Sequence, residues 1–265
     1  MRAFFFFIYV YRTNKNVITK SFMENKFNVP TEVVDLPSKG LVYPKENPLS
    51  SGTIEMKYMT AREEDILTNQ SYIQKGTVLD ELVKSLIVSD VKYDDLIVGD
   101  KNALLVAARI LGYGKDYTFM WGGEEQTVDL STIENKVILD HLYNPGVNEF
   151  KFTLPSTKID ITFKLLTSAD EKKINAELEG LKKIYKNNVP ELSTRLKYMI
   201  TSVEGNTENP HIREFVDKYL LARDSKALRE YIREVQPDVD LTFFPEGSNT
   251  KVNIPVGLNF FWPDA

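Results

Sequence analysis

Short runs of this chain alternate between apolar and polar residues, and longer runs repeat apolar residues at helical spacing. Residues Ile54–Tyr58 alternate, which predicts a half-buried strand, and Ile161–Leu165 repeat the pattern. Apolar residues three and four positions apart predict helices over Thr60–Asn69, Thr77–Val88, Asp100–Leu111, Thr167–Lys186, Pro190–Val203, His211–Leu221 and Asp224–Val235. Alternating runs around glycine turns predict hairpins at Tyr117–Leu130 and Leu241–Ile254, and Val147–Leu154 adds a strand.

One block of the sequence resembles another. Val98–Leu130 aligns without a gap on Ala222–Ile254, 124 positions later, with nine identities in 33 positions. Composition alone would give about two. The identical pairs include Asp100 with Asp224, Arg109 with Arg233 and Phe119 with Phe243. Upstream, Leu36-Pro37-Ser38 parallels Leu154-Pro155-Ser156, and Ile54–Thr60 parallels Ile161–Thr167. We therefore predict two tandem copies of one module of roughly 110 residues.

The order of the predicted elements favours an α+β fold. Strand and helix runs are segregated and do not alternate regularly as βαβ units, which argues against a doubly wound sheet. We expect each module to hold a small antiparallel sheet with a helical cluster. The first module spans residues 33–150 and the second spans residues 151–265. Residues 1–32 form an extra segment that is disordered or not native.

Composition narrows the function classes. The hydrophobic share of 42% is that of a folded protein. The net charge of −5 gives no basic footprint for nucleic acid. The absence of cysteine excludes disulfides and thiolate metal sites and suits a reducing compartment. The apolar run Ala3–Tyr11 is shorter than the ~20 residues of a membrane span. A signal peptide is the alternative, but no cleavage pattern follows, and we expect translation to begin at Met23.

Sequence motifs for catalysis are missing. Neither a dinucleotide fingerprint nor a phosphate-binding loop occurs. His141 and His211 lie in different modules, and we interpret them as a polar surface residue and a helix-start residue. Glu63-Glu64-Asp65 could form a cation site, but the capping box that begins at Thr60 already explains acids in a first helical turn. Arg109 and Arg233 suit internal salt bridges to nearby aspartates, with a partner's carboxylate as the alternative. We assign no catalytic, cofactor-binding or metal-binding residue.

Aromatic residues are the best candidates for partner binding. The chain ends with Phe260, Phe261 and Trp262, and the first copy has no equivalent run. The proline-containing segment Leu41–Gly52 has little counterpart in the second copy, and we interpret it as a surface loop that carries Tyr43. Large aromatic side chains dominate both cores and interfaces. We expect Tyr43, Phe260, Phe261 and Trp262 to contact a partner, while core packing of one or more C-terminal rings is compatible with that role.

Several of these residues resemble a known family. The run Val34–Pro44 (VDLPSKGLVYP) is similar to the opening of the baseplate hub assembly proteins of T4-like contractile-tailed bacteriophages. The segments that support this likeness by order and spacing are Met59–Leu67, Gly99-Asp100, Arg109–Tyr117 and Phe260–Pro263. The resemblance covers roughly residues 33–263. Similar sequences can carry a cysteine pair like a small zinc ribbon in the hairpin. Here those places hold Trp121-Gly122-Gly123 and Pro245-Glu246-Gly247, so we expect no metal.

The resemblance implies a chaperone-like factor or subunit of the tail baseplate hub, without enzymatic activity. Its partners would be other tail and hub proteins, with no nucleic acid, membrane, small-molecule substrate or cofactor. Its place would be the host cytoplasm during assembly, with the baseplate of the finished particle as the alternative. Two other functions stay open: a non-viral adaptor or regulatory binding module, and an enzyme with an unrecognised carboxylate site.

Overall fold

The structure is a computed structural model that describes residues 28–185, 189–245, 248 and 250–261. The chain divides into two compact units, residues 1–31 and residues 32–265, and the fold below is that of the second unit. The expected start of translation at Met23 lies outside the described residues, as does Trp262.

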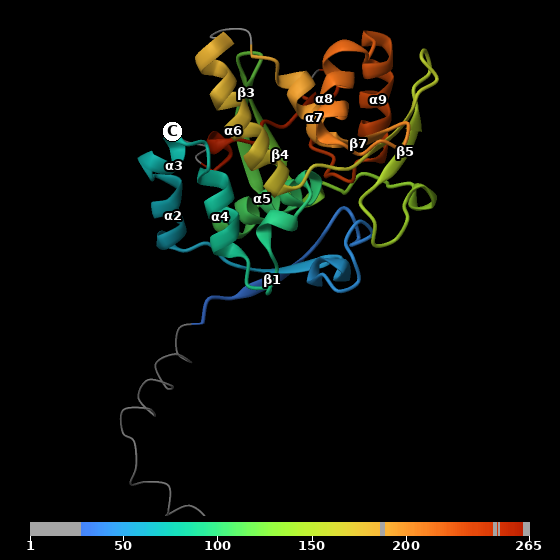
Figure 1. Cartoon of the computed structure of the whole chain (residues 1–265). Helices are drawn as coiled ribbons and strands as arrows, with labels where there is room; N and C mark the ends of the chain where they lie inside the picture. Colours follow the sequence, from blue (N-terminus) through green and yellow to red (C-terminus); the bar gives the residue numbers. More distant parts are fainter. Residues whose placement is uncertain (1–27, 186–188, 246–247, 249, 262–265) are drawn as a thin grey trace, which may run out of the picture. The chain divides into compact units, whose positions relative to one another are not determined.

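The described residues form an α+β fold with eight α-helices and several small sheets (Figure 1). The helices are α2 (Ala61–Leu67), α3 (Gln70–Gln74), α4 (Val78–Leu86), α5 (Val98–Tyr113), α6 (Ser168–Tyr185), α7 (Glu191–Met199), α8 (Asn209–Lys218) and α9 (Ala222–Val235). The strands are β1 (Thr31–Asp35), β2 (Thr53–Lys57), β3 (Asp116–Trp121), β4 (Glu124–Asp129), β5 (Phe150–Thr153), β6 (Asp160–Phe163), β7 (Ile200–Val203), β8 (Thr242–Phe243) and β9 (Val252–Asn253). The sheets are β1-β2, β3-β4, β5-β6-β7 and β8-β9, and the last three are antiparallel.

Most predicted helices are present within a few residues of their expected bounds, but one prediction is wrong at its end. The expected helix Pro190–Val203 stops at Met199, and Ile200–Val203 forms strand β7, which pairs with β6. Ile, Thr and Val are β-branched, and a strand at the edge of β6 accommodates them better than a last helical turn. The short helix α3 was not predicted.

The two halves repeat one local arrangement. In the first half Met56 of β2 bridges Ile87, the residue that follows α4. In the second half Phe163 of β6 pairs with Ile200, the residue that follows α7. The backbone angles of Ile87 (φ −68°, ψ 126°) and Ile200 (φ −69°, ψ 128°) are nearly the same. Each half therefore places a helix and a paired extended residue beside its central strand.

The repeated hairpins agree in type but differ in register. The hairpin of β3 and β4 pairs Thr118 with Thr127. The hairpin of β8 and β9 pairs Thr242 with Asn253. Because 127 + 124 = 251, the register of the second hairpin is shifted by two residues. The common elements are compatible with a duplication, which stays a prediction.

Contacts between the halves are extensive. The amide of Val98 donates to Leu166 O at 3.0 Å, and the amide of Ser168 donates to Leu96 O at 2.7 Å. One large buried apolar cluster contains residues of both halves, and a smaller one (Leu166, Ile174, Leu178) lies along α6. Residues 32–265 thus pack as one unit, and their division into modules at residue 150 stays a prediction.

Gly99 permits a close backbone approach between the halves. A β-carbon built on Gly99 would lie 1.7 Å from the carbonyl oxygen of Pro237 and 2.8 Å from its carbon. Both are backbone atoms, so no side chain can move aside to relieve the clash. Only glycine lets the first turn of α5 pack directly on the chain after α9.

We predict that Gly99→Ala destabilises the fold by at least ~1–3 kcal/mol, because the added methyl overpacks a backbone contact. The matched control is Gly180→Ala on α6, where an added β-carbon has nothing within 4 Å. Alanine is the better residue in a helix interior, so the control should stabilise the chain by ~0.5–1 kcal/mol. Urea unfolding measures both. Equal unfolding midpoints for the Gly99 variant and the wild-type chain would contradict the close approach.

Candidate interaction surface

The aromatic residues predicted as partner anchors are buried. Tyr43 is 4% exposed, and Phe260 and Phe261 are both 0% exposed. The ring of Phe260 packs edge-on against Tyr117 and Phe261, with centroids 4.8 Å and 5.5 Å away. These three side chains therefore serve the core in this structure, which corrects the expectation that they contact a partner.

The segment Leu41–Gly52 is not the simple surface loop that its prolines suggested. Leu49 and Val42 are almost fully buried, and Pro48–Ser51 form a 3-10 turn that Asn47 caps. The Tyr43 hydroxyl donates to Asp100 Oδ2 at 2.6 Å and accepts from the Ile97 amide at 3.0 Å. The segment folds inward because its polar and apolar side chains both find partners beneath it.

Asp100 is the buried acceptor on which this segment converges. It is 0% exposed and also accepts from the amide and the hydroxyl of Ser38, at 2.9 Å and 2.7 Å. Burial raises the pKa of the Asp100 carboxyl, and the hydrogen bonds from Tyr43 and Ser38 offset part of that increase. Because this carboxyl group accepts three hydrogen bonds and is not exposed to solvent, its role is structural.

Asp224 repeats this contact in the second half. Its carboxylate accepts from the amide of Ser156 at 2.7 Å and from the amide and hydroxyl of Thr157 at 3.1 Å and 2.9 Å. Burial acts to raise the pKa of Asp224, but these hydrogen bonds outweigh it and the pKa is lowered. In both halves, a buried aspartate in the first turn of a helix therefore holds the turn after a Leu-Pro dipeptide.

The two matched arginines have different surroundings. Arg109 is buried, and its guanidinium donates to main-chain oxygens of Phe260 at 2.9 Å, Gly114 at 2.9 Å and Asp116 at 3.2 Å. It therefore anchors the C-terminal segment and the start of β3. Arg233 is exposed, and no ion pair with a described residue is recorded for it, so the internal salt bridge expected for it is wrong.

The other candidate polar residues have structural positions. His141 is an exposed residue of a 3-10 turn, and His211 lies in the first turn of α8. Among the described residues, no group of three or more His, Cys, Asp or Glu side chains is placed to hold a metal ion.

Glu63 is fully buried, unlike the exposed Glu64 and Asp65 that follow it. Its carboxylate accepts from Lys57 at 2.8 Å, from the Thr60 amide and hydroxyl at 3.0 Å and 2.6 Å, and from Ser85 at 2.7 Å. Burial acts to raise the pKa of Glu63, yet these donors outweigh burial and lower it to about 2. The predicted capping box is present, and it extends to β2 and α4.

Two adjoining hollows form the candidate interaction surface. The first, which we call the basic hollow, has a volume of about 240 Å³ and is lined by Lys136, Arg229, Ile232, Arg233, Gln236 and Asp238. The second, the apolar hollow, has a volume of about 220 Å³ and is lined by Ile97, Val98, Gly99, Leu165, Leu166, Glu171, Arg195, Met199 and Gln236. Gln236 lines both, so the hollows meet at the residue that follows α9.

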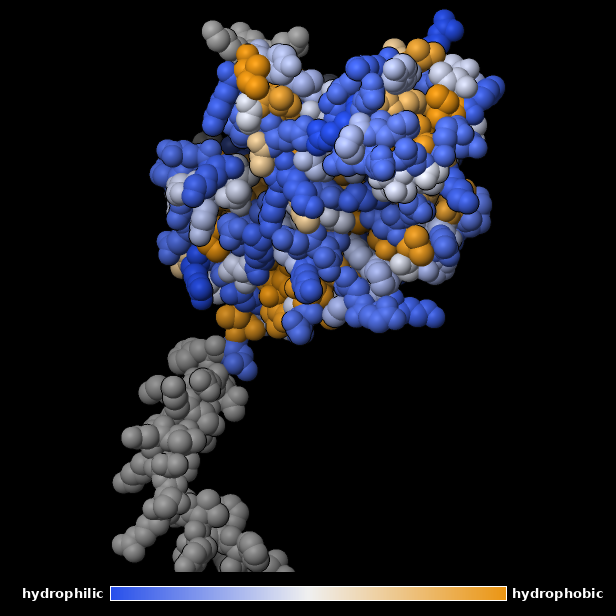
Figure 2. All heavy atoms as spheres, in the orientation of Figure 1, coloured by the Kyte–Doolittle hydropathy of each residue, from blue (hydrophilic) through white to orange (hydrophobic). Residues whose placement is uncertain are grey.

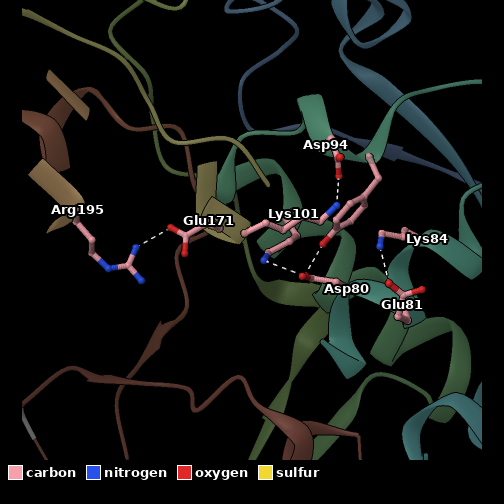
Figure 3. A network of polar contacts seen from close by, with 9 residues as sticks. Asp80, Glu81, Lys84, Asp94, Lys101, Glu171 and Arg195 are labelled. Atoms are coloured by element: carbon pink, nitrogen blue, oxygen red, sulfur yellow. Dashed lines mark hydrogen bonds and ion pairs between the residues drawn. The ribbon is translucent and has the colours of Figure 1, made fainter. Parts of the chain in front are cut away.

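An ion-pair network borders the apolar hollow (Figure 3). Arg195 of α7 extends toward Glu171 of α6, and the two groups lie 2.6 Å apart. Beyond them Lys101 of α5 lies 3.2 Å from Asp80 of α4. Each of these pairs joins two helices of the same half, and the ion pair between Lys172 of α6 and Asp94 joins one half to the other.

The face shown in Figure 2 is mainly hydrophilic, with its apolar residues in small groups. One group lies at the end of α6, where Ile184 is 72% exposed. Scattered exposed apolar residues are ordinary on a folded protein. The adjoining hollows are more informative because they combine apolar walls with converging charged groups.

Only part of this surface could be found in the sequence. Arg233 is identified from the sequence, but because it aligns with Arg109 and not because it lines a hollow. Arg229 was missed, although two arginines four positions apart on one helix are a visible signal, since like charges at that spacing repel. Gln236 and Gly99 were missed because no local sequence pattern predicts that these two residues line the same hollow.

No protein-family model, curated protein or solved structure matches this chain. None of the described helices is long and apolar enough to cross a membrane.

We predict that Glu63→Gln destabilises the chain in a pH-dependent way. The pKa of Glu63 is lowered from 4.5 to about 2 in the folded chain, so its ionised form stabilises the fold above pH 4.5. That contribution is lost as the pH falls from 4.5 toward 2. Near neutral pH the variant should lose ~1–3 kcal/mol of stability, because charge-assisted hydrogen bonds are replaced by weaker ones.

Melting temperatures of wild type and variant across this pH range test the prediction. The difference between them should shrink as the pH approaches 2. Asp65→Asn, at an exposed neighbouring position, is the matched control and should show little difference at any pH. A deficit in Glu63→Gln that stays constant down to pH 2 would show that folding does not lower the pKa of Glu63.

Proposed function

We propose that this chain is a non-enzymatic binding protein that acts in assembly of the tail baseplate hub of a T4-like bacteriophage. It works as a chaperone-like factor or as a hub subunit, and its partners are other tail and hub proteins. It acts in the host cytoplasm during assembly, and it stays in the finished baseplate if it is a subunit. It uses no cofactor, metal, nucleic acid, membrane or small-molecule substrate.

The observation that carries a binding function is the pair of adjoining hollows. They lie where the two halves meet, and residues from α5, α6, α7 and α9 line them. An apolar wall beside arginines that have no ion-pair partner among the described residues is the composition expected of a protein-binding site, where apolar contacts supply affinity and arginines supply orientation.

The assignment to the baseplate hub is supported by the residues that resemble that family. Ser38 and Tyr43 of the Leu-Pro-Ser-Lys-Gly opening both donate to Asp100, which belongs to another segment of the likeness. Arg109 of a third segment donates to Phe260 of the fourth. Segments that are distant in sequence thus contact one another, so the likeness concerns a set of residues that act together in the fold.

Affinity purification during infection tests the proposal. A tagged chain is expressed in bacteria infected by the phage that encodes it, and the co-purifying proteins are identified by mass spectrometry. We expect tail and hub proteins of the phage to be enriched over an untagged control. Mass spectrometry of purified particles then separates a subunit, which is present, from an assembly factor, which is absent. Enrichment of the same host proteins with and without infection would instead favour an adaptor outside the virion.

A further inference from the structure

The basic hollow carries more positive charge than its surroundings neutralise. Lys136 lies 3.5 Å from Asp238, and Asp238 also accepts from the amide group of Asn102 at 3.0 Å. Arg229 donates its Nε to the main-chain oxygen of Ser225, at 3.2 Å. Within the described part of the chain no carboxylate is recorded as an ion-pair partner of Arg229 or Arg233. Among the residues that the structure describes, the hollow therefore has two guanidinium groups without an ion-pair partner, on a chain of net charge −5.

The placement of these arginines opposes the stability of α9. They stand four residues apart, so their side chains are neighbours on one face of the helix, and like charges at that spacing are destabilising. The helix dipole favours Arg233 in the last turn, but it does not account for Arg229 one turn earlier. A bound anion between the two guanidinium groups would turn this repulsion into attraction. Arginine suits that role, because its planar donors match the two oxygens of a carboxylate.

The apolar hollow adjoins the proposed anion site, so its lining determines which ligand group fits beside the anion. Its walls include Leu165, Leu166, Val98 and Met199, and the ion pair of Glu171 and Arg195 lies at its border. The charge of Arg195 is already balanced by Glu171 at 2.6 Å and Glu191 at 3.2 Å. An apolar side chain fits this hollow, and a second anion does not.

We propose that the adjoining hollows bind an acidic peptide segment of a partner protein. A carboxylate of the segment lies between Arg229 and Arg233, and a neighbouring leucine-sized side chain enters the apolar hollow across Gln236. This inference rests on the proposed function as a binding protein and names the chemistry of the partner. A polyanion such as nucleic acid fits less well, because the apolar hollow offers a longer phosphate chain no free cation: Arg195, the arginine in its lining, is already paired with Glu171.

Fluorescence anisotropy with purified full-length chain tests the inference. The probe is a fluorescein-labelled peptide, Glu-Leu-Asp-Glu-Leu-Asp. One comparison peptide replaces each acid by its amide, and another replaces each leucine by serine. The variant is Arg229→Ala with Arg233→Ala. The matched control is Arg223→Ala, an exposed arginine of the same helix that does not line the hollow. Circular dichroism checks that all variants are folded, which we expect because the replaced side chains are exposed.

We expect the acidic peptide to bind at least tenfold more tightly than either comparison peptide. The double variant should lose at least tenfold in affinity for it, and Arg223→Ala should stay within twofold of wild type. Added salt should weaken binding, because the arginines are exposed. Equal binding of the acidic and amide peptides, or no loss in a folded double variant, would overturn the inference. So would a single-stranded oligonucleotide that binds more tightly than the peptide through the same two arginines. If tail proteins co-purify with the chain but the peptide does not bind, only this inference fails.

Discussion

The buried carboxylate of Asp100 is the interaction on which the rest of the structure depends. A buried carboxyl group is costly unless donors surround it, and here Ser38 supplies two hydrogen bonds and Tyr43 a third. Tyr43 in turn accepts from the Ile97 amide, just before α5 begins. The opening segment and the start of α5 are therefore fixed together. The contacts of the next residues follow from this, with Val98 bonded to Leu166 and Gly99 packed on Pro237. These contacts fix the part of the apolar hollow that Val98, Gly99 and Leu166 line beside Gln236.

In the second half a buried aspartate is also surrounded by hydrogen-bond donors, but the donors differ slightly. Asp224 receives two backbone amides and one hydroxyl, whereas Asp100 receives one amide and two hydroxyls. Near each central strand a lysine and an acid also form a pair, Lys57 with Glu63 and Lys164 with Asp170, both at 2.8 Å. A turn held by a buried aspartate and a strand held by a capped helix thus recur, even though the hairpins differ in register.

Sequence patterns predicted the features that depend on neighbouring residues. Helical spacing and the Thr60 capping box placed most helices within a few residues, because neighbouring residues determine both. The strand Ile200–Val203 escaped prediction since its partner strand, β6, lies about 40 residues earlier in the chain. Tyr43 looked like a surface anchor because its segment is rich in proline, and its buried acceptor is 57 residues away. The hollows could not be predicted at all, because they exist only where α9, α5 and α7 converge.

Hydrogen exchange in Asp100→Asn, compared with Asp224→Asn, tests the central claim most directly. An asparagine side chain has one acceptor oxygen, so at least one donor from Ser38 or Tyr43 loses its partner. We expect faster amide exchange in Asp100→Asn at residues 36–52 and in the first turn of α5, with α9 unchanged. Asp224→Asn should show the converse, with faster exchange at Ser156 and Thr157. Protection of residues 36–52 that is the same in Asp100→Asn and in the wild-type chain would contradict the account.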